Sequence, residues 1–313
     1  METRTRAITG LIELLPAGAA LSMCATGATW SEGPVWLPET QSLRWSDIPG
    51  NRILEFSTLT SELSVYATEV EFTNGRTLDH DGTVIQCSHG RRRVERDDHG
   101  VVTTIVDSYN GVRLNSPNDV VVAVDGTIWF SDPPYGIIVP IEGHPGEREY
   151  GDHWVFRHDP LTGETRPAVI DVEEPNGLAF SPDGSLLYVS DTSAATNENG
   201  NHHIRVYDVA GGRCKNGRTF AVIDEGLSDG FRVDTEGNVW TSSGTGIIVF
   251  SPEGVELGRI PVPETVSNVC FGGPDGTDLY ITASTSLYRI STLATDAAIS
   301  RRTSAEPVAV ADR

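Results

Sequence analysis

The sequence predicts an all-β protein, a six-bladed β-propeller with four-stranded blades around a central channel. The first observation is a motif that occurs six times: a polar residue, a short apolar strand and an acidic turn residue seven positions after the polar one. In five copies glycine follows the acidic residue, which is a hairpin signal. The second observation is that two more short strands, rich in Val, Ile, Phe, Tyr and Trp, follow each hairpin. Four strands per repeat and six repeats are typical of a propeller.

The copies are in phase along almost the whole chain. Their leading polar residues are Glu32, Asn74, Asn118, Asn176, Asp229 and Asn268. Their acidic turn residues are Glu39, Asp81, Asp125, Asp183, Glu236 and Asp275, and only the first is followed by Thr40 in place of glycine. We expect the second strands of the hairpins at 42–46, 83–87, 127–131, 185–190, 238–242 and 277–282. A two-sheet sandwich would not need six copies in phase.

Residues 1–313 are predicted to form one propeller domain, with two departures from the repeat. Residues 1–29 precede the first copy and have no blade of their own, so we expect them to close the last blade and remove an exposed edge. The long interval between the third and fourth copies holds a proline- and glycine-rich insertion at 133–151. Long loops in compact folds are often functional, so this insertion is expected to cover the channel mouth.

Charge and composition exclude several classes of partner. The formal net charge of −21 disfavours nucleic acid and anionic membrane surfaces, because the long-range field would repel both. No apolar run approaches the roughly 20 residues of a membrane-spanning helix, and no signal-peptide pattern begins the chain, so a cytoplasmic protein is expected. The four cysteines are far apart and are interpreted as reduced buried thiols. The sequence does not indicate an oligomeric state.

The six leading residues are the candidate site. The innermost strand of each blade lines the channel, so residues at one position of the repeat lie at one depth and face the axis. All six carry side-chain oxygen, and two are carboxylates. Converging buried carboxylates and amides are costly without a partner, and a hard cation supplies one. The spacing therefore predicts one divalent cation, with Ca²⁺ first because it takes six to eight oxygen ligands.

Other interpretations of the ring stay open at this point. Asn-Gly and Asp-Gly are common turn residues, and for any single copy that interpretation is the better one. Mg²⁺, Mn²⁺ and Zn²⁺ remain alternatives to Ca²⁺, although the absence of His and Cys from the ring weighs against a dedicated zinc or copper site. His89 and His144, the second of them in the insertion, are weaker candidates for the channel mouth, as are Asn74 and Asn268 for the ring.

Four segments carry a family resemblance: 31–36 (SEGPVW), 113–119 (RLNSPND) with 129–136 (WFSDPPYG), 175–183 (PNGLAFSPD) and 229–234 (DGFRVD). In this order they resemble the senescence-marker-protein/gluconolactonase family, which includes regucalcin and bacterial sugar lactonases, and the form is most similar to the bacterial gluconolactonase branch. The resemblance implies a propeller with one divalent cation held by Glu32, Asn176 and Asp229, with Asn118 as a fourth ligand or near neighbour. It also implies that Asp229 is the general base and that Arg113 and Asn115 contact the substrate.

The function that we expect is metal-dependent hydrolysis of a small sugar lactone. No serine-hydrolase elbow, P-loop, dinucleotide fingerprint or HExxH motif offers another chemistry. Two alternatives remain. Related phosphotriesterases and paraoxonases share the metal ring, so an organophosphate hydrolase is one. The other is a non-enzymatic propeller in which the cation is structural or the channel binds a ligand or partner.

Overall fold

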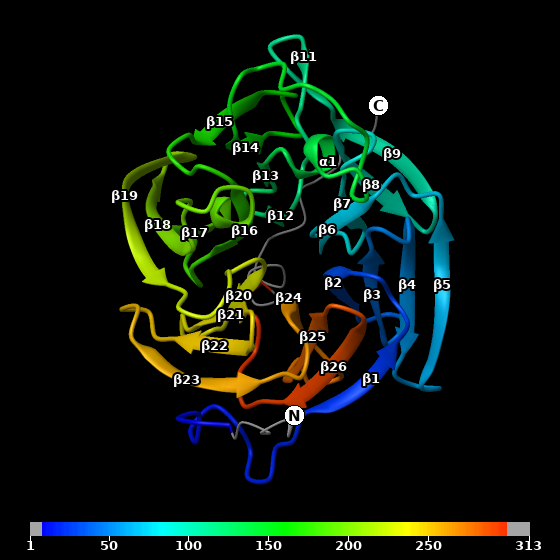
Figure 1. Ribbon diagram of the computed structural model, residues 1–313, viewed down its shortest axis with the longest axis vertical. Coiled ribbons are helices and arrows are strands. Elements are labelled where there is room, and N and C mark those ends of the chain that lie inside the picture. Colours follow the sequence, from blue (N-terminus) through cyan, green and yellow to red (C-terminus); the bar gives the residue numbers. More distant parts are fainter. Residues whose placement is uncertain (1–7, 299–313) are drawn as a thin grey trace.

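The computed structural model describes residues 8–298, and nearly all regular structure in this part of the chain is β-strand. Figure 1 shows six sheets arranged around one axis, each with its first strand innermost. Every sheet has four strands, and all neighbouring strands in the sheets are antiparallel. The predicted six-bladed propeller is confirmed.

The blades follow one another along the chain. Blades one and two contain β2 (Ser31–Leu37), β3 (Ser42–Asp47), β4 (Arg52–Ser57), β5 (Glu62–Thr68), β6 (Thr73–Leu78), β7 (Val84–Ser88), β8 (Arg93–Asp98) and β9 (Val101–Val106). Blades three and four contain β12 (Val120–Val122), β13 (Ile128–Asp132), β14 (Trp154–His158), β15 (Thr165–Val169), β16 (Pro175–Phe180), β17 (Leu186–Asp191), β18 (His203–Ala210) and β19 (Arg213–Val222). Blades five and six contain β20 (Phe231–Val233), β21 (Val239–Ser243), β22 (Gly246–Phe250), β23 (Glu256–Pro261), β24 (Val266–Gly272), β25 (Asp278–Ala283) and β26 (Ser286–Ser291).

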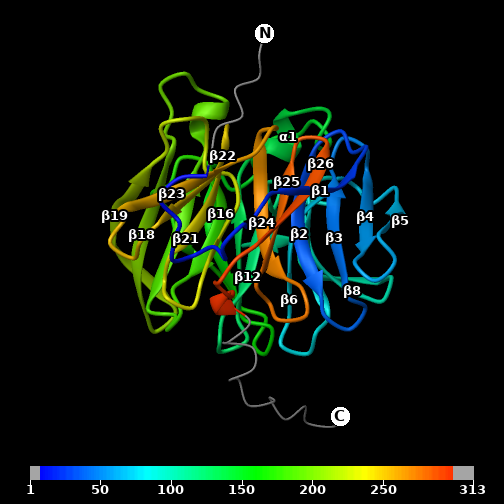
Figure 2. The same cartoon turned by 90° about the horizontal axis from the view of Figure 1, so that it is seen from below.

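The N-terminal part of the chain supplies the outermost strand of blade six. Strand β1 (Ser22–Thr26) pairs with β26, so this blade combines both ends of the domain. The preceding residues run along blade five, where Thr9 bridges to Arg259 and Leu11 and Leu15 enter the core between blades five and six. Figure 2 shows β1 beside β26 and the blue N-terminal segment crossing to the neighbouring blade. Of the predicted closing segment, residues 1–7 lie outside the described part.

Apolar side chains fill the space between most neighbouring blades. Trp129 and Leu178 lie in the core between blades three and four, and Trp240 and Phe271 in the core between blades five and six. Such close packing of large side chains supplies most of the stability of a β fold.

The contact between blades one and two is different, because its apolar cluster is small and charged groups complete it. Arg44 forms ion pairs with Glu55 (2.7 Å) and Asp97 (3.5 Å), and its guanidinium lies 3.4 Å from the centre of the Tyr66 ring. Arg76 is fully buried and donates to the Gly33 carbonyl (2.8 Å) and the Ser46 hydroxyl (2.6 Å). The Arg44–Asp97 pair and the two Arg76 hydrogen bonds cross between the blades, whereas Glu55 and Tyr66 hold Arg44 from within blade one.

The glycine after the leading polar residue serves close packing around the axis, and it is not a turn residue. A Cβ on Gly177 would lie 2.3 Å from the Asp229 carbonyl oxygen, and one on Gly75 would lie 2.5 Å from that of Asn118. Strand pairing is irregular at these positions, for example between Pro175 and Leu178. Such bulges change the direction of side chains, which lets consecutive inner strands meet while their polar residues face the axis. The turn-residue interpretation of these Asn-Gly and Asp-Gly pairs is thus wrong.

The insertion after β13 contains the short helix α1 (Tyr135–Ile138), and the two-stranded hairpin of β10 (Ser108–Tyr109) and β11 (Val112–Arg113) lies near it. A 3₁₀ turn, Ser193–Ala195, begins the long loop that joins β17 to β18. Arg92 fastens the insertion to blade two by donating to the Glu147 carbonyl (3.1 Å). Among residues 8–298, no helix is long and apolar enough to cross a membrane.

Candidate metal and active site

The six leading residues lie at one end of the inner strands. Glu32, Asn74, Asn176 and Asn268 stand near the starts of β2, β6, β16 and β24, whereas Asn118 and Asp229 each precede an inner strand by two residues. All are buried except Asp229, which is partly exposed. The structure thus places every predicted ring residue at the same end of its inner strand, and we call these six residues the ring.

Several oxygen atoms of the ring have no hydrogen-bond partner. Oε1 of Glu32 and Oδ1 of Asn74 are buried and unpaired, and no side-chain hydrogen bond of Asn118 is found within the described residues. Oδ2 of Asp119, the residue after Asn118, is also buried and unpaired. Buried polar atoms are almost always satisfied in proteins, so a cluster of unpaired acceptors indicates a missing positive partner.

Glu32 is held by its other carboxylate oxygen. Oε2 accepts hydrogen bonds from the Gly33 amide (2.5 Å) and from Nδ2 of Asn268 (3.1 Å). Asn268 is fixed in turn, because its Oδ1 accepts from the Val269 amide (2.8 Å) and from Nη1 of Arg232 (3.5 Å). Asn268 therefore orients Glu32 and leaves Oε1 as the oxygen available to a ligand.

Asn176 is oriented from the insertion. Its Nδ2 donates to the Thr192 hydroxyl (3.2 Å), which lies 2.6 Å from the Tyr135 hydroxyl. The side chain of Asn176 also forms a hydrogen bond with the carboxylate of Asp229, which links these two ring residues. Helix α1, which carries Tyr135, thus contributes to the geometry of the ring although it lies far away in the sequence.

Asp229 is held through its backbone, and it is the one ring residue that is partly exposed. Its amide donates to Oγ of Ser242 (2.8 Å), and its carbonyl accepts from the Gly177 amide (2.9 Å) and Oγ of Ser190 (3.0 Å). Burial raises the pKa of Asp229 well above its usual range, and the carboxylates of Glu32 and Glu142 add to this effect. Burial also raises the pKa of Glu32 to about 7.

The two candidate histidines lie in different environments. His89 is fully buried beside the ring, with Nε2 3.2 Å from Nδ2 of Asn74 and Nδ1 3.0 Å from the Glu142 carbonyl. The carbonyl can only accept, so Nδ1 carries the proton and Nε2 accepts from Asn74. Burial lowers the pKa of His89 to about 4, so its imidazole is neutral near pH 7. His144 is exposed and pairs with Glu71 (2.8 Å).

The predicted substrate contacts, Arg113 and Asn115, are also separated. Arg113 is exposed on the β10–β11 hairpin, and its backbone amide donates to Glu149 (2.8 Å). Asn115 is fully buried, and its Nδ2 donates to the Tyr150 hydroxyl and to the carbonyls of Asp132 and Asp152. In this arrangement Asn115 holds the base of the insertion. Its role in binding substrate stays a prediction, with the unpaired Oδ1 as the atom available for it.

Sequence reasoning missed several residues near the ring. Asp119 adds a third carboxylate near Glu32. Glu142, in the insertion, lies close enough to raise the pKa of Asp229, and Arg232 donates a hydrogen bond to Asn268. Asp119 and Arg232 stand inside the segments that carry the family resemblance, which is a signal that could have identified them. The role of Tyr135 depends on a contact across 57 positions of the chain and has no local signal.

The ring fits a hard cation better than a soft one. No group of three or more His, Cys, Asp or Glu side chains that could hold a metal is found in residues 8–298, so any cation at the ring would depend on amide oxygens as well as carboxylates. The ring offers two carboxylates and four amides, and its unpaired atoms are oxygens. Carboxylate and amide oxygens are typical ligands of Ca²⁺. Two neighbouring carboxylates with raised pKa values are also what a site lacking its positive charge is expected to show.

The fold and the ring define the class of protein, a six-bladed propeller with an oxygen-rich polar site at one end of its channel. The chain belongs to the family described as SMP-30/Gluconolactonase/LRE-like region, which matches residues 30–285. This confirms the family resemblance found in the sequence.

Similar proteins include enzymes that act on lactones by name. A gluconolactonase of Zymomonas mobilis is 32% identical over 304 residues, covering 89% of this chain and 83% of the relative. A pentonolactonase of Haloferax volcanii is 30% identical over 264 residues, covering 82% of each chain. The solved structure of a gluconolactonase from Xanthomonas campestris is 39% identical with a TM-score of 0.82, covering 88% of this chain and 90% of that one.

Proposed function

We propose that this protein is a divalent-metal-dependent lactonase that hydrolyses a small sugar lactone. The observation that carries the proposal is the set of buried, unpaired ring oxygens, above all Oε1 of Glu32, beside the partly exposed carboxylate of Asp229. The relatives that are gluconolactonases and a pentonolactonase support the choice of a lactone over a phosphotriester.

Glu32, Asn118, Asn176 and Asp229 would hold the cation, with Ca²⁺ favoured by the all-oxygen donor set. When bound, the cation supplies Lewis-acid polarisation of a carbonyl oxygen and offsets the negative charge of the ring. Glu32 is kept in place by Gly33 and Asn268, and Asn176 by Thr192, so these two ligands need little reorganisation.

Asp229 is the proposed general base. Asp229 is the ring residue that is partly exposed, so its carboxylate is the best placed of the ring to meet both water and substrate. Asp229 takes a proton from water as the water oxygen forms a bond to the lactone carbonyl carbon. Asp229 then returns the proton to the endocyclic oxygen of the lactone as the bond between that oxygen and the carbonyl carbon breaks, which gives a hydroxy acid. Glu142 and the insertion border this end of the channel and would limit the shape of the sugar.

A substrate and metal panel tests the proposal. Acid release from gluconolactone, xylonolactone and a phosphotriester is measured with Ca²⁺, Mg²⁺, Mn²⁺ or Zn²⁺ added to chelator-treated protein. We expect a sugar lactone to be the preferred substrate and activity to return on addition of metal. Full activity in protein shown to be free of metal would refute the metal dependence. A metal-dependent melting temperature without any hydrolysis would support a structural cation instead.

A pair of matched variants tests the base. Asp229→Asn should lower kcat by at least about 100-fold because proton transfer is lost, while the far-ultraviolet circular dichroism stays unchanged. Glu147→Gln, which alters an exposed carboxylate of the insertion, should retain activity. Near-normal turnover by Asp229→Asn would assign the base to another residue.

A further inference from the structure

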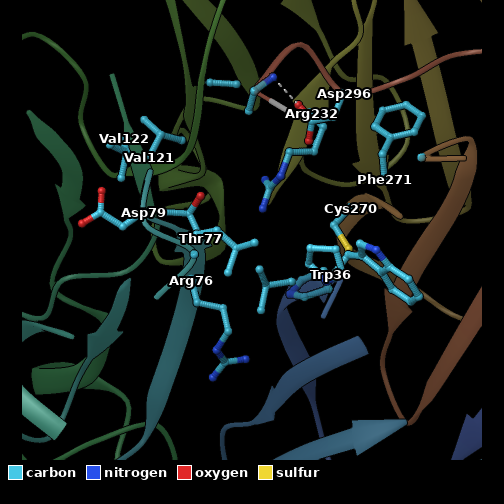
Figure 3. A pocket seen from close by; sticks show the side chains of 18 of the residues that line it. Trp36, Arg76, Thr77, Asp79, Val121, Val122, Arg232, Cys270, Phe271 and Asp296 are labelled. Carbon is cyan, nitrogen blue, oxygen red and sulfur yellow. Dashed lines mark hydrogen bonds between the residues drawn. The ribbon is translucent and has the colours of Figure 1, made fainter. Parts of the chain in front are cut away.

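A second cavity lies at the opposite end of the inner strands from the ring. It has a volume of about 510 Å³ and is lined by residues from the second halves of all six inner strands. Figure 3 shows side chains from several blades converging on this space. Small-molecule sites typically have about 300–1,000 Å³, so the cavity is large enough for a ligand.

Most of the wall is apolar. Strands from every blade contribute aliphatic or aromatic side chains, including those of Trp36, Leu78, Val121, Phe180, Val233 and Phe271. The apolar part of the wall is therefore suited to a hydrocarbon body.

Two arginines line the cavity, and Arg232 has fewer hydrogen-bonded terminal nitrogens than Arg76, although its charge also acts on the nearby carboxylates of Glu32 and Asp119. Both terminal nitrogens of Arg76 donate to neighbouring atoms of blade one. Arg232 uses Nη1 alone, for the Phe231 carbonyl (2.8 Å) and, weakly, for Asn268 (3.5 Å). No ion pair and no further hydrogen bond of Arg232 is found in the described part of the chain, and Figure 3 shows its side chain reaching into the cavity.

The charged side chains that line the cavity restrict the chemical class of ligand that it can bind. A partly buried guanidinium with free N–H groups favours a carboxylate, which it can bind with two parallel hydrogen bonds. Three aspartates also line the cavity: Asp79, Asp275 and Asp296. Asp79 and Asp275 follow the ends of β6 and β24, and Asp296 bridges to Asp234, which follows the end of β20. These carboxylates therefore lie toward the outer end of the cavity. Acidic groups there disfavour ligands with several negative charges, such as nucleotides.

We propose that this cavity binds a small monocarboxylate with an apolar body, whose carboxylate pairs with Arg232 and whose hydrocarbon part fills the space between the six inner strands. The site adjoins the ring at Arg232, whose Nη1 donates weakly to Asn268 (3.5 Å), and extends from there toward the opposite end of the inner strands. Arg232 follows Asp229 by three positions, which corresponds to about 10 Å along a fully extended chain. The proposal does not depend on lactone hydrolysis, because binding can be measured without any substrate.

Calorimetry on the full chain with Ca²⁺ present tests the proposal, with octanoate and its neutral amide, octanamide, as probes. We expect octanoate to bind at least about tenfold more tightly than octanamide, because only the carboxylate forms a charge-assisted pair. Arg232→Met keeps an apolar stem and should abolish this difference. Arg213→Met, which alters an exposed hairpin arginine, should leave both affinities unchanged.

A second variant separates the cavity from the ring. Val122→Phe adds volume at a lining position that is not part of the ring, so octanoate affinity should fall about tenfold while lactone turnover is retained. Absence of octanoate binding at millimolar concentration, equal affinity for octanoate and octanamide, or unchanged binding by both Arg232→Met and Val122→Phe would each overturn the proposal. These outcomes leave the lactonase proposal untouched, since that depends on the ring alone.

Discussion

Removing the amide that holds Glu32 should weaken metal binding without removing a ligand. In Asn268→Ala, Oε2 of Glu32 loses the hydrogen bond from Nδ2 (3.1 Å) and keeps the one from the Gly33 amide (2.5 Å). A hydrogen bond to a charged group contributes about 1.5–3 kcal/mol. Converted at about 1.4 kcal/mol per factor of ten, this predicts roughly 10- to 100-fold weaker Ca²⁺ binding. The same range is typical for residues that orient metal ligands.

Calorimetric titration of Ca²⁺ into chelator-treated protein measures this effect. The matched control is Asn216→Ala, because Nδ2 of Asn216 also donates to a carboxylate, that of Asp208 (2.7 Å), but on an exposed hairpin. The control should bind Ca²⁺ as the unmodified protein does. Adding Asn268→Ala to Glu32→Gln should cause little further loss, since both changes act on one interaction.

The reasoning would be refuted if Asn268→Ala bound Ca²⁺ with unchanged affinity while Glu32→Gln lost binding. Glu32 would then be a ligand that needs no support from Asn268. Equal and additive losses from the two substitutions would also contradict it, because they would show that Asn268 acts independently of Glu32.

Three further predictions concern stability. Chelation should lower the melting temperature, and Ca²⁺ at 100 times its Kd should restore about 2.7 kcal/mol of the free energy of unfolding. An unchanged melting temperature would contradict a cation bound only by the folded state. Burial depresses the pKa of His89 from its usual 6.5 to about 4. As pH decreases from 6.5 to 4, the imidazole is protonated in the unfolded chain before it is protonated in the folded protein, so the free energy of unfolding should fall. Thermal melts of His89→Gln should show a shallower acid limb, by up to about 3 kcal/mol; an identical limb would show that His89 is not the group responsible. Arg44→Met leaves the buried Asp97 without this ion pair and should cost about 3 kcal/mol in urea unfolding. The exposed pair of Arg218 and Asp208 offers the control, as Arg218→Met should change stability little; equal effects would contradict a special role for the charged interface.

The repeat made the fold and the ring predictable. A propeller places equivalent residues of each blade at equivalent depth, so the leading residues could be assigned to one ring without any coordinates. The second strands of the hairpins were also predictable, and the observed bounds differ by about one residue, as with β7 (Val84–Ser88) against 83–87. The role of the following glycine was left open, since a local pattern cannot separate a turn from the close approach of two distant strands.

Contacts between distant segments decided the rest of the site. His89 and His144 look alike in the sequence, yet the path of the insertion buries one beside Asn74 and leaves the other exposed next to Glu71. The family resemblance implies that Asn115 contacts substrate, which stays a prediction, and the structure adds that its amide is bound to the base of the insertion.

By itself, the sequence determined the number of blades and the polar residue that each one directs to the axis, because both follow from a local repeat. Only the tertiary structure decided which ring oxygens are free. Asn268 donates to Glu32 from a position 236 residues away, and Tyr135 fixes Thr192 beside Asn176 from the insertion. Hydrogen bonds of this kind depend on how the blades close around the axis, and no local pattern of residues encodes them.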